Sequence, residues 1–365
     1  MSAMRERFHA VVADLLDADP RVVLVLADIG VSHLRKLGVL ERHPGRVINV
    51  GIREQLQLSI AGGLALEGFR PIVHSYTPFL VERPFEQIKL DLGHQDVGAV
   101  LVSIGASYDA AHEGRTHQAP EDVALLSTLP GWTIHVPGHR DEAEALLRDA
   151  VAAEGRVYVR LTDEENAEPM RGDGLQLVRQ ARAGAPLVVA VGTTLDPVLE
   201  ATADLDAGVA YARTVRPFDA VGLRAALCGT DVVLVEPYLA GTSSSQVSDA
   251  LADRPHRLLA LGVREPELRR YGTGPEHRVA HGLDAFGIRA SLDAWTASAA
   301  ASEVDAARSR PPVAAQRKPG RPDQQSDGDV ATAKNRGWSP VVAIGGKKTQ
   351  VTSAGKPEFK RDPLP

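Results

Sequence analysis

Short apolar runs rich in Val, Ile and Leu alternate with longer helical patterns through the first 160 residues of the chain. This alternation is typical of βαβ units and of a parallel sheet with helices on both faces. The helical pattern at 52–67 is apolar on most of its sides, so we expect that helix to be buried. The apolar runs predict strands at 22–27, 47–50, 71–75, 99–104, 132–136 and 157–161, and the longer patterns predict helices at 4–17, 52–67, 80–93, 120–128 and 140–153.

A polar stretch after residue 162 interrupts this pattern, and a second α/β pattern follows it. That second pattern predicts strands at 187–191, 208–212, 231–236 and 257–261, and helices at 195–203, 219–228, 244–252 and 276–290. From residue 300 the chain turns to Pro, Gly, Lys, Ser and Gln without an apolar period, which predicts disorder. We therefore expect a doubly wound, parallel-sheet α/β domain at 1–162, a linker at 163–174, a smaller α/β domain at 175–295 and a disordered tail at 300–365.

Composition narrows the class of protein. The apolar fraction of 44% and the charged fraction of 24% are those of a soluble globular protein. Before residue 300 the chain carries 29 basic and 40 acidic residues, which argues against nucleic acid as a partner, because neutralising phosphates requires a basic face. The single cysteine, Cys228, argues against a disulfide framework and fits a cytoplasmic protein. No apolar run approaches the roughly 18 residues that span a membrane, and the N-terminal pattern is not that of a signal peptide.

The most informative block is NVGIREQLQLSIAGGLALEGFRPIVHSY, residues 49–76. A predicted strand ends at Val50, Gly51 provides a turn, and Glu54 lies in the first turn of the next helix. The helix dipole favours an acidic residue at such a position in any protein. The position of Glu54 alone therefore does not identify a catalytic group.

Four ordered elements together resemble the pyrimidine-binding domain of the transketolase and deoxyxylulose-phosphate synthase group. They are the turn at 51–54, the small-residue helix at 61–68, the aromatic strand end at 74–79 and the loop HEGRTHQ at 112–118. The resemblance covers about residues 4–162, and the second α/β pattern looks like the C-terminal domain of the same family. It implies thiamine diphosphate as the coenzyme.

The resemblance also implies roles for individual residues. Glu54 would hydrogen-bond a ring nitrogen of the coenzyme's aminopyrimidine and so promote loss of a proton from the thiazolium carbon. Burial suits this role, since desolvation raises the pKa of a carboxyl group. Phe79 matches the ring that stacks on the pyrimidine, and Tyr76 matches the aromatic residue before it. Ordinary packing is the alternative for these two rings. Asp28 falls on a position near the coenzyme. His117 matches the residue that contacts the carbonyl or hydroxyl of the donor substrate.

Some residues at the family's substrate-binding positions match the family, and others differ from it. Arg5, Ser32 and Arg160 fall on the positions that hold a sugar phosphate, and a guanidinium fork suits a phosphate. The family's sugar-binding aspartate is Glu113 here, and a further family histidine falls on Gly105. We expect Glu113 to push a carboxylate towards the ketose hydroxyls and Gly105 to open a gap in the same pocket. Both changes argue against the standard pentose phosphate donors.

The diphosphate-binding half of the family has no counterpart in these residues. The family holds the diphosphate and Mg²⁺ with Gly-Asp-Gly followed by Asn-Asn, whereas residues 172–174 lie in the linker and no asparagine occurs between Asn166 and Asn335. We read 172–174 as a turn and expect no metal ligand on this chain. The resemblance implies the small subunit of a split transketolase, which transfers a two-carbon ketol unit from a phosphorylated ketose to an aldehyde. A separate subunit would hold the diphosphate and Mg²⁺ in a heterotetramer.

Two alternatives stay open. The first keeps the coenzyme but changes the reaction to a decarboxylating acyl transfer, like that of deoxyxylulose-phosphate synthase or a 2-oxoacid dehydrogenase β chain. The absence of the family histidine at Gly105 is compatible with it. The second is a catalytically silent scaffold or regulatory partner, against which Glu54, Phe79 and His117 count.

Overall fold

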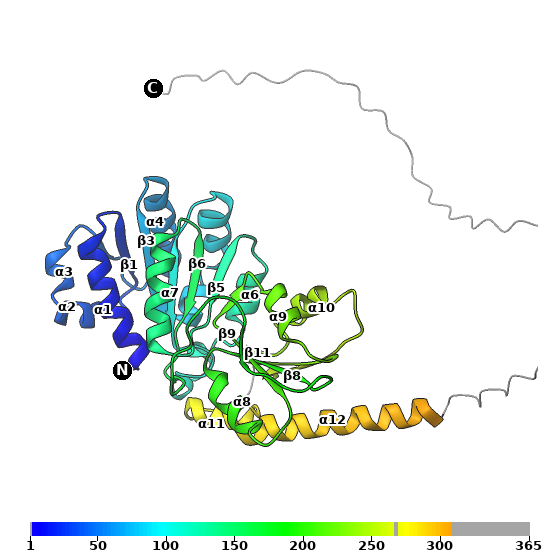
Figure 1. The fold of residues 1–365 in the computed structure, drawn as a ribbon. Coiled ribbons are helices and arrows are strands. Elements are labelled where there is room, and N and C mark those ends of the chain that lie inside the picture. Colours follow the sequence, from blue (N-terminus) through cyan, green and yellow to red (C-terminus); the bar gives the residue numbers. More distant parts are fainter. Residues whose placement is uncertain (1, 266–268, 309–365) are drawn as a thin grey trace, which may run out of the picture. The chain divides into compact units, whose positions relative to one another are not determined.

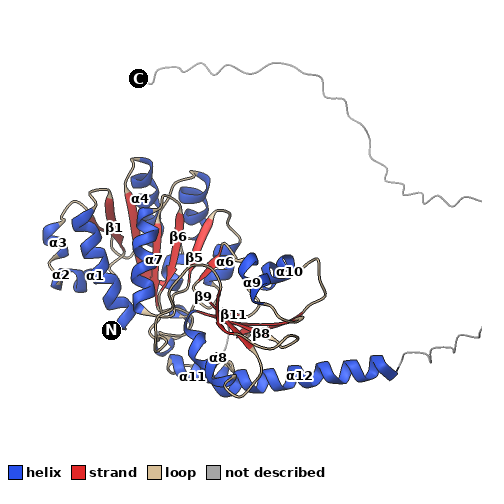
Figure 2. Ribbon diagram, in the orientation of Figure 1, coloured by secondary structure: helices blue, strands red, loops and turns tan. Residues whose placement is uncertain are grey.

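A computed structural model describes residues 2–265 and 269–308, which form two β-sheets flanked by helices (Figures 1 and 2). The larger sheet has the strand order β10-β5-β6-β4-β3-β1-β2, and every strand in it is parallel except β10. Its strands are β1 (Val22–Leu26), β2 (Val47–Asn49), β3 (Arg70–Tyr76), β4 (Val100–Ile104), β5 (Trp132–His135), β6 (Arg156–Arg160) and β10 (Thr214–Arg216).

Helices cover both faces of the larger sheet, so the predicted doubly wound fold is confirmed. The helices α1 (Ala3–Ala18) and α7 (Arg140–Ala152) lie side by side on one face (Figure 1). On α1 the buried apolar side chains recur at helical spacing, at residues 4, 8, 12 and 16, which is why this sequence forms an amphipathic helix. The opposite face is covered by α4 (Glu54–Leu66), α6 (Asp122–Ser127) and the helical turns at 78–94.

The smaller sheet has the strand order β12-β11-β8-β9-β7, in which only β7 is antiparallel. One face packs on α8 and α12, and the other on α9 and α10. These elements are β7 (Gln176–Arg179), β8 (Leu187–Val191), β9 (Gly208–Ala212), β11 (Asp231–Leu239), β12 (Arg257–Val263), α8 (Leu195–Ala201), α9 (Ala220–Ala226), α10 (Ser244–Ala250), α11 (Gly274–Ala280) and α12 (Ala285–Arg308). Strand β10 comes from this half of the chain but pairs with β5 in the larger sheet.

Several predicted elements differ from the structure. The helix predicted at 80–93 is two π-helical turns, η1 (Pro78–Glu82) and η2 (Ile88–His94), around the short α5 (Phe85–Gln87), because Pro84 has no N–H to continue a regular helix. The helix predicted at 276–290 is divided between α11 and α12, where Gly282 adopts a φ of 66°. Helix α12 extends through residues 300–308, at the start of the tail that we predicted to be disordered, and the rest of that tail lies outside the described residues.

Four short helices and the strands β7 and β10 were not predicted. The helices are α2 (Val31–Lys36), α3 (Val39–Arg42), η3 (Ala111–Glu113) and η4 (Arg115–His117), and a further 3₁₀ turn, η5 (Gly192–Thr194), precedes α8. All are too short for an apolar period to reveal them. Among residues 2–265 and 269–308, no helix has the length and apolar character needed to cross a membrane.

The chain changes direction across the larger sheet at β1, because β2 pairs with one side of β1 and β3 with the other. In open parallel sheets such a switch creates a crevice outside the carboxyl ends of the strands, where ligands bind. Asp28 follows β1, Glu54 opens α4 just after β2, and Tyr76 is the last residue of β3. The topology therefore brings three of the predicted residues to one edge of the sheet.

Gly105 follows β4 at this edge, and its role differs from the gap that we predicted. It has a φ of 69°, and a Cβ atom added to it would lie 2.4 Å from Cδ1 of Tyr76. The Tyr76 ring thus fills the space beside Gly105. The glycine is required both by its backbone conformation and by the close approach of this ring.

Three histidines lie together beneath the same edge. The His9 ring is 4.6 Å from that of His33 and 5.8 Å from that of His74. His74 Nδ1 donates to the Val102 carbonyl at 2.9 Å, whereas both nitrogens of His9 and Nε2 of His74 are buried without a hydrogen-bond partner among the described residues. Burial lowers the pKa of His9 to about 2, and the charges of the neighbouring histidines and of Arg5 add to this effect. Burial also lowers the pKa of His74 to about 3.

These two histidines predict a pH dependence of stability. Both stay neutral in the folded chain, while the unfolded chain takes up protons below its pKa of about 6.5. The free energy of unfolding should therefore fall by about 1–2 kcal/mol per histidine between pH 7 and pH 5. Urea unfolding at both pH values should show a smaller fall for His9→Met than for wild type. The exposed His94→Met is the control, and an unchanged fall in His9→Met would contradict the assignment.

A second prediction concerns Gly105. Gly105→Ala should reduce the free energy of unfolding by about 1–3 kcal/mol, because the new methyl group meets Tyr76 and the backbone is strained. Gly63→Ala is the matched control: Gly63 lies on the exposed side of α4 with no atom within 4 Å of an added Cβ, so this change should stabilise the chain slightly. Equal stability of Gly105→Ala and wild type would rule out the close packing.

Candidate coenzyme and substrate site

Three aromatic rings meet where β3 ends. The Tyr76 ring lies 6.0 Å from Phe79 and 5.7 Å from His117, and the Phe79 and His117 rings are 4.9 Å apart, all in edge-to-face arrangements. Tyr76 is the last residue of β3, Phe79 lies on η1 and His117 ends η4. His117 Nδ1 is 3.0 Å from Thr116 Oγ1. The structure thus joins three residues that the sequence analysis selected from two separate motifs, and we call them the ring cluster.

Glu54 joins the ring cluster through a residue that the sequence analysis missed. Its carboxylate is only 6% exposed and accepts a hydrogen bond of 2.9 Å from Arg83 Nη1. The Cζ atom of Arg83 lies 3.8 Å from the centroid of the Phe79 ring. Phe79 and Arg83 are four residues apart, a spacing that puts two side chains on one side of a helical segment. That spacing, next to a predicted stacking ring, was the available signal for Arg83.

A second carboxyl group lies one residue before Arg83. Glu82 is partly buried on η1, and burial together with the charge of Glu121 raises its pKa to about 7. The neighbouring Arg115 donates to Glu121 at 2.8 Å and opposes this rise. A carboxyl group with this pKa can accept or release a proton near neutral pH.

Arg5 lies at the margin of the ring cluster, with its Cζ atom 5.9 Å from the centroid of Tyr76. Its Nε atom is buried without a hydrogen-bond partner among the described residues. Asp28 is exposed and is held by Asn49, which donates to its carboxylate at 2.8 Å. Ser32 is exposed on α2, and no contact described for residues 2–265 connects it to the ring cluster.

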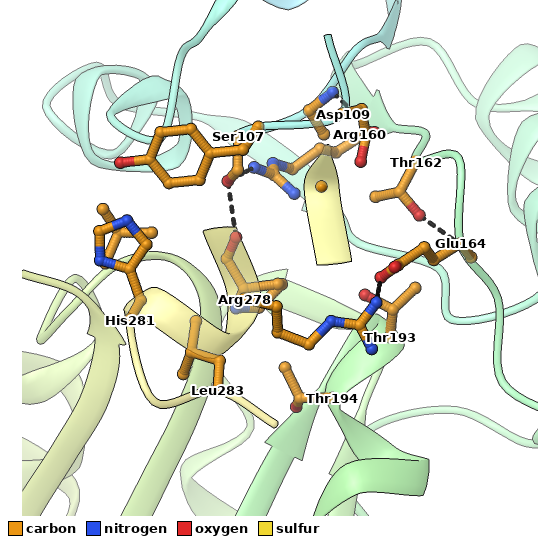
Figure 3. Close-up of a pocket in the computed structure, with 15 residues that line it drawn as sticks. Ser107, Asp109, Arg160, Thr162, Glu164, Thr193, Thr194, Arg278, His281 and Leu283 are labelled. Carbon is orange, nitrogen blue, oxygen red and sulfur yellow. Dashed lines mark hydrogen bonds and ion pairs between the residues drawn. The ribbon is translucent and has the colours of Figure 1, made fainter. Parts of the chain in front are cut away.

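Arg160 has different surroundings from those expected of a phosphate ligand. It is 1% exposed, and it donates through Nε to Asp122 at 2.7 Å and through Nη2 to Ser107 at 2.6 Å. Figure 3 shows it at a small pocket that also contains Asp109 and Arg278. We therefore withdraw Arg160 from the expected phosphate ligands, because its guanidinium already serves these buried partners.

That pocket has a volume of about 70 Å³ and lies between the loop after β4 and residues of the smaller α/β half. Pockets that take metabolites usually exceed about 300 Å³, so it suits a few water molecules better than a sugar phosphate. Arg278 is ion-paired with Glu164 at its wall (Figure 3). Burial, and then the nearby charge of Asp163, raises the pKa of Asp109 to about 7. None of the residues of the ring cluster lines it.

Glu113 lies on η3 with an exposed side chain, and its carboxylate is 3.5 Å from Nε2 of His112. The described contacts do not direct it towards the ring cluster. Among residues 2–265 and 269–308, no group of three or more His, Cys, Asp or Glu side chains is arranged to hold a metal ion. The arrangement therefore offers a buried carboxylate, two flat rings and an imidazole.

This chain is similar to known proteins in sequence and in fold. Residues 1–167 match the family described as "Transketolase, pyrimidine binding domain". A protein of Rhodococcoides fascians named "Uncharacterized 33.6 kDa protein in fasciation locus" is 51% identical over 294 residues, which are 79% of this chain and 93% of that protein. The 6-deoxy-6-sulfo-D-fructose transketolase subunit SqwH of Clostridium sp. (strain MSTE9) is 29% identical, over 72% of this chain and 85% of that subunit.

The chain spans about half the length of other curated relatives. The 1-deoxy-D-xylulose-5-phosphate synthase of Thioalkalivibrio sulfidiphilus is 30% identical over 77% of this chain but only 45% of that enzyme. A solved structure described as "Split gene transketolase, inactive beta4 tetramer" has a TM-score of 0.67 and 24% identity, and covers 80% of this chain and 96% of that chain. The chain therefore belongs to the transketolase family, whose pyrimidine-binding domain matches residues 1–167.

Proposed function

We propose that this chain is the small subunit of a split, thiamine-diphosphate-dependent transketolase that moves a two-carbon ketol unit from a ketose to an aldehyde. The observation that carries the proposal is the buried Glu54 carboxylate connected through Arg83 to Phe79, in the ring cluster with His117. Within this proposal, residues 1–162 are the pyrimidine-binding domain, 163–174 the linker and 175–295 the C-terminal domain.

The residues of the site fit an aminopyrimidine. Glu54 already accepts a hydrogen bond from a flat, N–H-bearing group that lies over the face of Phe79, and an aminopyrimidine needs the same two contacts. When bound, thiamine diphosphate supplies a carbon nucleophile and an electron sink for cleaving the bond next to a carbonyl. Glu54 would hold a proton at the pyrimidine ring nitrogen, and Phe79 would fix the plane of that ring. His117 would donate to the donor's carbonyl oxygen as charge develops there.

A partner chain is supported by the outer side of α4. Leu56 and Leu66 on this helix are 44% and 58% exposed, and Ile52, two residues before the helix begins, is 72% exposed. Our expectation that the helix is buried on most sides holds only for the side that carries Glu54, Leu58 and Ala61. Large exposed apolar side chains beside a site are typical of a protein interface. We propose that a separate subunit covers it and holds the diphosphate and Mg²⁺, in a heterotetramer of two chains each.

The donor substrate would be a phosphorylated ketose, with the Arg5 guanidinium as its main phosphate ligand in place of Arg160. The free, buried Nε of Arg5 beside Tyr76 supports this role. Ser32, on α2, and Glu113, on η3, are exposed and have no described contact with the ring cluster, so we rank them below Arg5. Asp28 stays a proposed neighbour of the coenzyme.

The second candidate is a decarboxylating acyl transfer of the kind named for the synthase relatives. One observation favours it: Tyr76, not an imidazole, fills the space at Gly105. The imidazole that reads a sugar hydroxyl in the family is absent from this position.

The first test is self-sufficiency. The purified chain should bind thiamine diphosphate and Mg²⁺ weakly, as measured by calorimetry. Binding and turnover should return when a subunit that carries Gly-Asp-Gly and Asn-Asn is added; neighbouring genes are the place to look for it. In that complex Glu54→Gln should lower kcat by at least ~10²-fold, because it removes an acid–base group. Glu67→Gln, exposed at the end of the same helix, should leave kcat unchanged. Binding below ~1 μM by the lone chain, on the usual affinity scale, would overturn the split-enzyme proposal.

The second test is donor choice. In the complex, xylulose 5-phosphate should have a kcat/KM at least about tenfold below that of the best deoxy or branched ketose phosphate, because Gly105 lacks the imidazole that would pair with a substrate hydroxyl. The panel includes pyruvate, with release of CO₂ as the readout. Efficient use of xylulose 5-phosphate would refute the pocket argument, and efficient use of pyruvate would favour the second candidate.

A further inference from the structure

Arg83 makes two contacts that belong to the proposed coenzyme site. Its guanidinium donates to the buried carboxylate of Glu54 at 2.9 Å, and its Cζ atom lies 3.8 Å from the centre of the Phe79 ring. The Arg83 side chain itself is 43% exposed, although Glu54 is 6% exposed and Phe79 is buried. A half-exposed cation therefore covers two buried groups.

A guanidinium and an aminopyrimidine are chemically alike at these two contacts. Both are flat, both carry N–H groups at their edge, and both stack on an aromatic face. The face of Phe79 that the Arg83 guanidinium covers cannot stack on a pyrimidine at the same time. Arg83 and the pyrimidine would therefore compete for that face.

The backbone of Arg83 is held independently of its guanidinium. Its N–H donates to the Pro78 carbonyl at 3.1 Å, and its own carbonyl accepts from Gln55 Nε2 at 3.3 Å. The side chain can therefore rotate outward without a change in the backbone, and its exposure shows that solvent already reaches it. Outward rotation would uncover Glu54 and Phe79 together.

We propose that Arg83 occupies the place of the aminopyrimidine in the free chain and closes the site until its guanidinium rotates into solvent. This inference rests on the proposed function, because it takes Glu54 and Phe79 as the pyrimidine contacts. Closure keeps a buried carboxylate paired while the coenzyme is absent. It also lowers the apparent affinity for the coenzyme by the fraction of chains that are closed.

Thiamine is the probe, since it carries the aminopyrimidine and needs no diphosphate-binding partner. Its dissociation constant from the full chain is measured by ligand-observed NMR for wild type, Arg83→Met, Arg83→Lys and Glu54→Gln. Arg83→Met keeps an unbranched apolar side chain but loses the guanidinium, and should bind thiamine about tenfold more tightly than wild type. Arg83→Lys keeps the charge without the planar fork and should fall between the two.

The matched control is Arg148→Met. Arg148 has a 40% exposed side chain and an ion pair of 2.9 Å with Glu144, but lies on α7, on the opposite face of the sheet. It should bind thiamine as wild type does. Adding Glu54→Gln to Arg83→Met should abolish the gain, because the carboxylate that Arg83 releases is then absent.

A second measurement tests the closed contact without any ligand. Arg83→Met should lower the urea midpoint in the wild-type background and lower it by less in the Glu54→Gln background, where only the contact with Phe79 remains to be lost. No coupling between the two residues would overturn the closed state in the free chain.

The outcomes separate the two proposals. If thiamine binds Arg83→Met no more tightly than wild type, while Glu54→Gln abolishes binding, the closure by Arg83 is refuted and the coenzyme site stands. If none of these variants binds thiamine at millimolar concentration, or if binding does not depend on Glu54, the proposed function fails and the closure fails with it.

Discussion

A buried carboxylate requires a partner, and this requirement organises the edge of the larger sheet. Glu54 opens α4 just after β2, so it lies at the edge of the sheet where the chain changes direction at β1, the place where parallel sheets usually bind ligands. Leaving it there uncompensated would be costly, because a desolvated charge is stable only with opposite charge or strong hydrogen bonds. Arg83 supplies both and brings Phe79 with it. The ring cluster forms around this arrangement.

Much of this edge could be predicted from the sequence. The strands of the larger sheet are continuous apolar runs, and such runs are recognisable because both faces of the sheet are covered. The three members of the ring cluster were selected individually through motifs from two segments, residues 74–79 and 112–118. The structure then joins these segments in one place.

Other features could not be predicted, for physical reasons. The contact of Arg83 with Glu54 depends on the π-helical turn at 78–82, and no local propensity specifies such a turn. We interpreted Gly105 as a position where a side chain is missing. Spacing along the sequence does not reveal that Tyr76, at the end of the adjacent strand, packs against it. Arg160 suited a phosphate by residue type, but its ion pair with Asp122 arises only when β6 and α6 pack together. In each case the deciding contact lies far away in the sequence.

Strand β10 has a consequence for any attempt to divide the chain. It pairs antiparallel with β5, and so it closes an end of the larger sheet with residues from the opposite half of the polypeptide. A fragment that stops before residue 214 would expose the unpaired N–H and C=O groups of β5 along that end. Bare sheet edges recruit strands from other molecules and promote aggregation. The second half of the chain thus protects the first from self-association, whatever else it contributes.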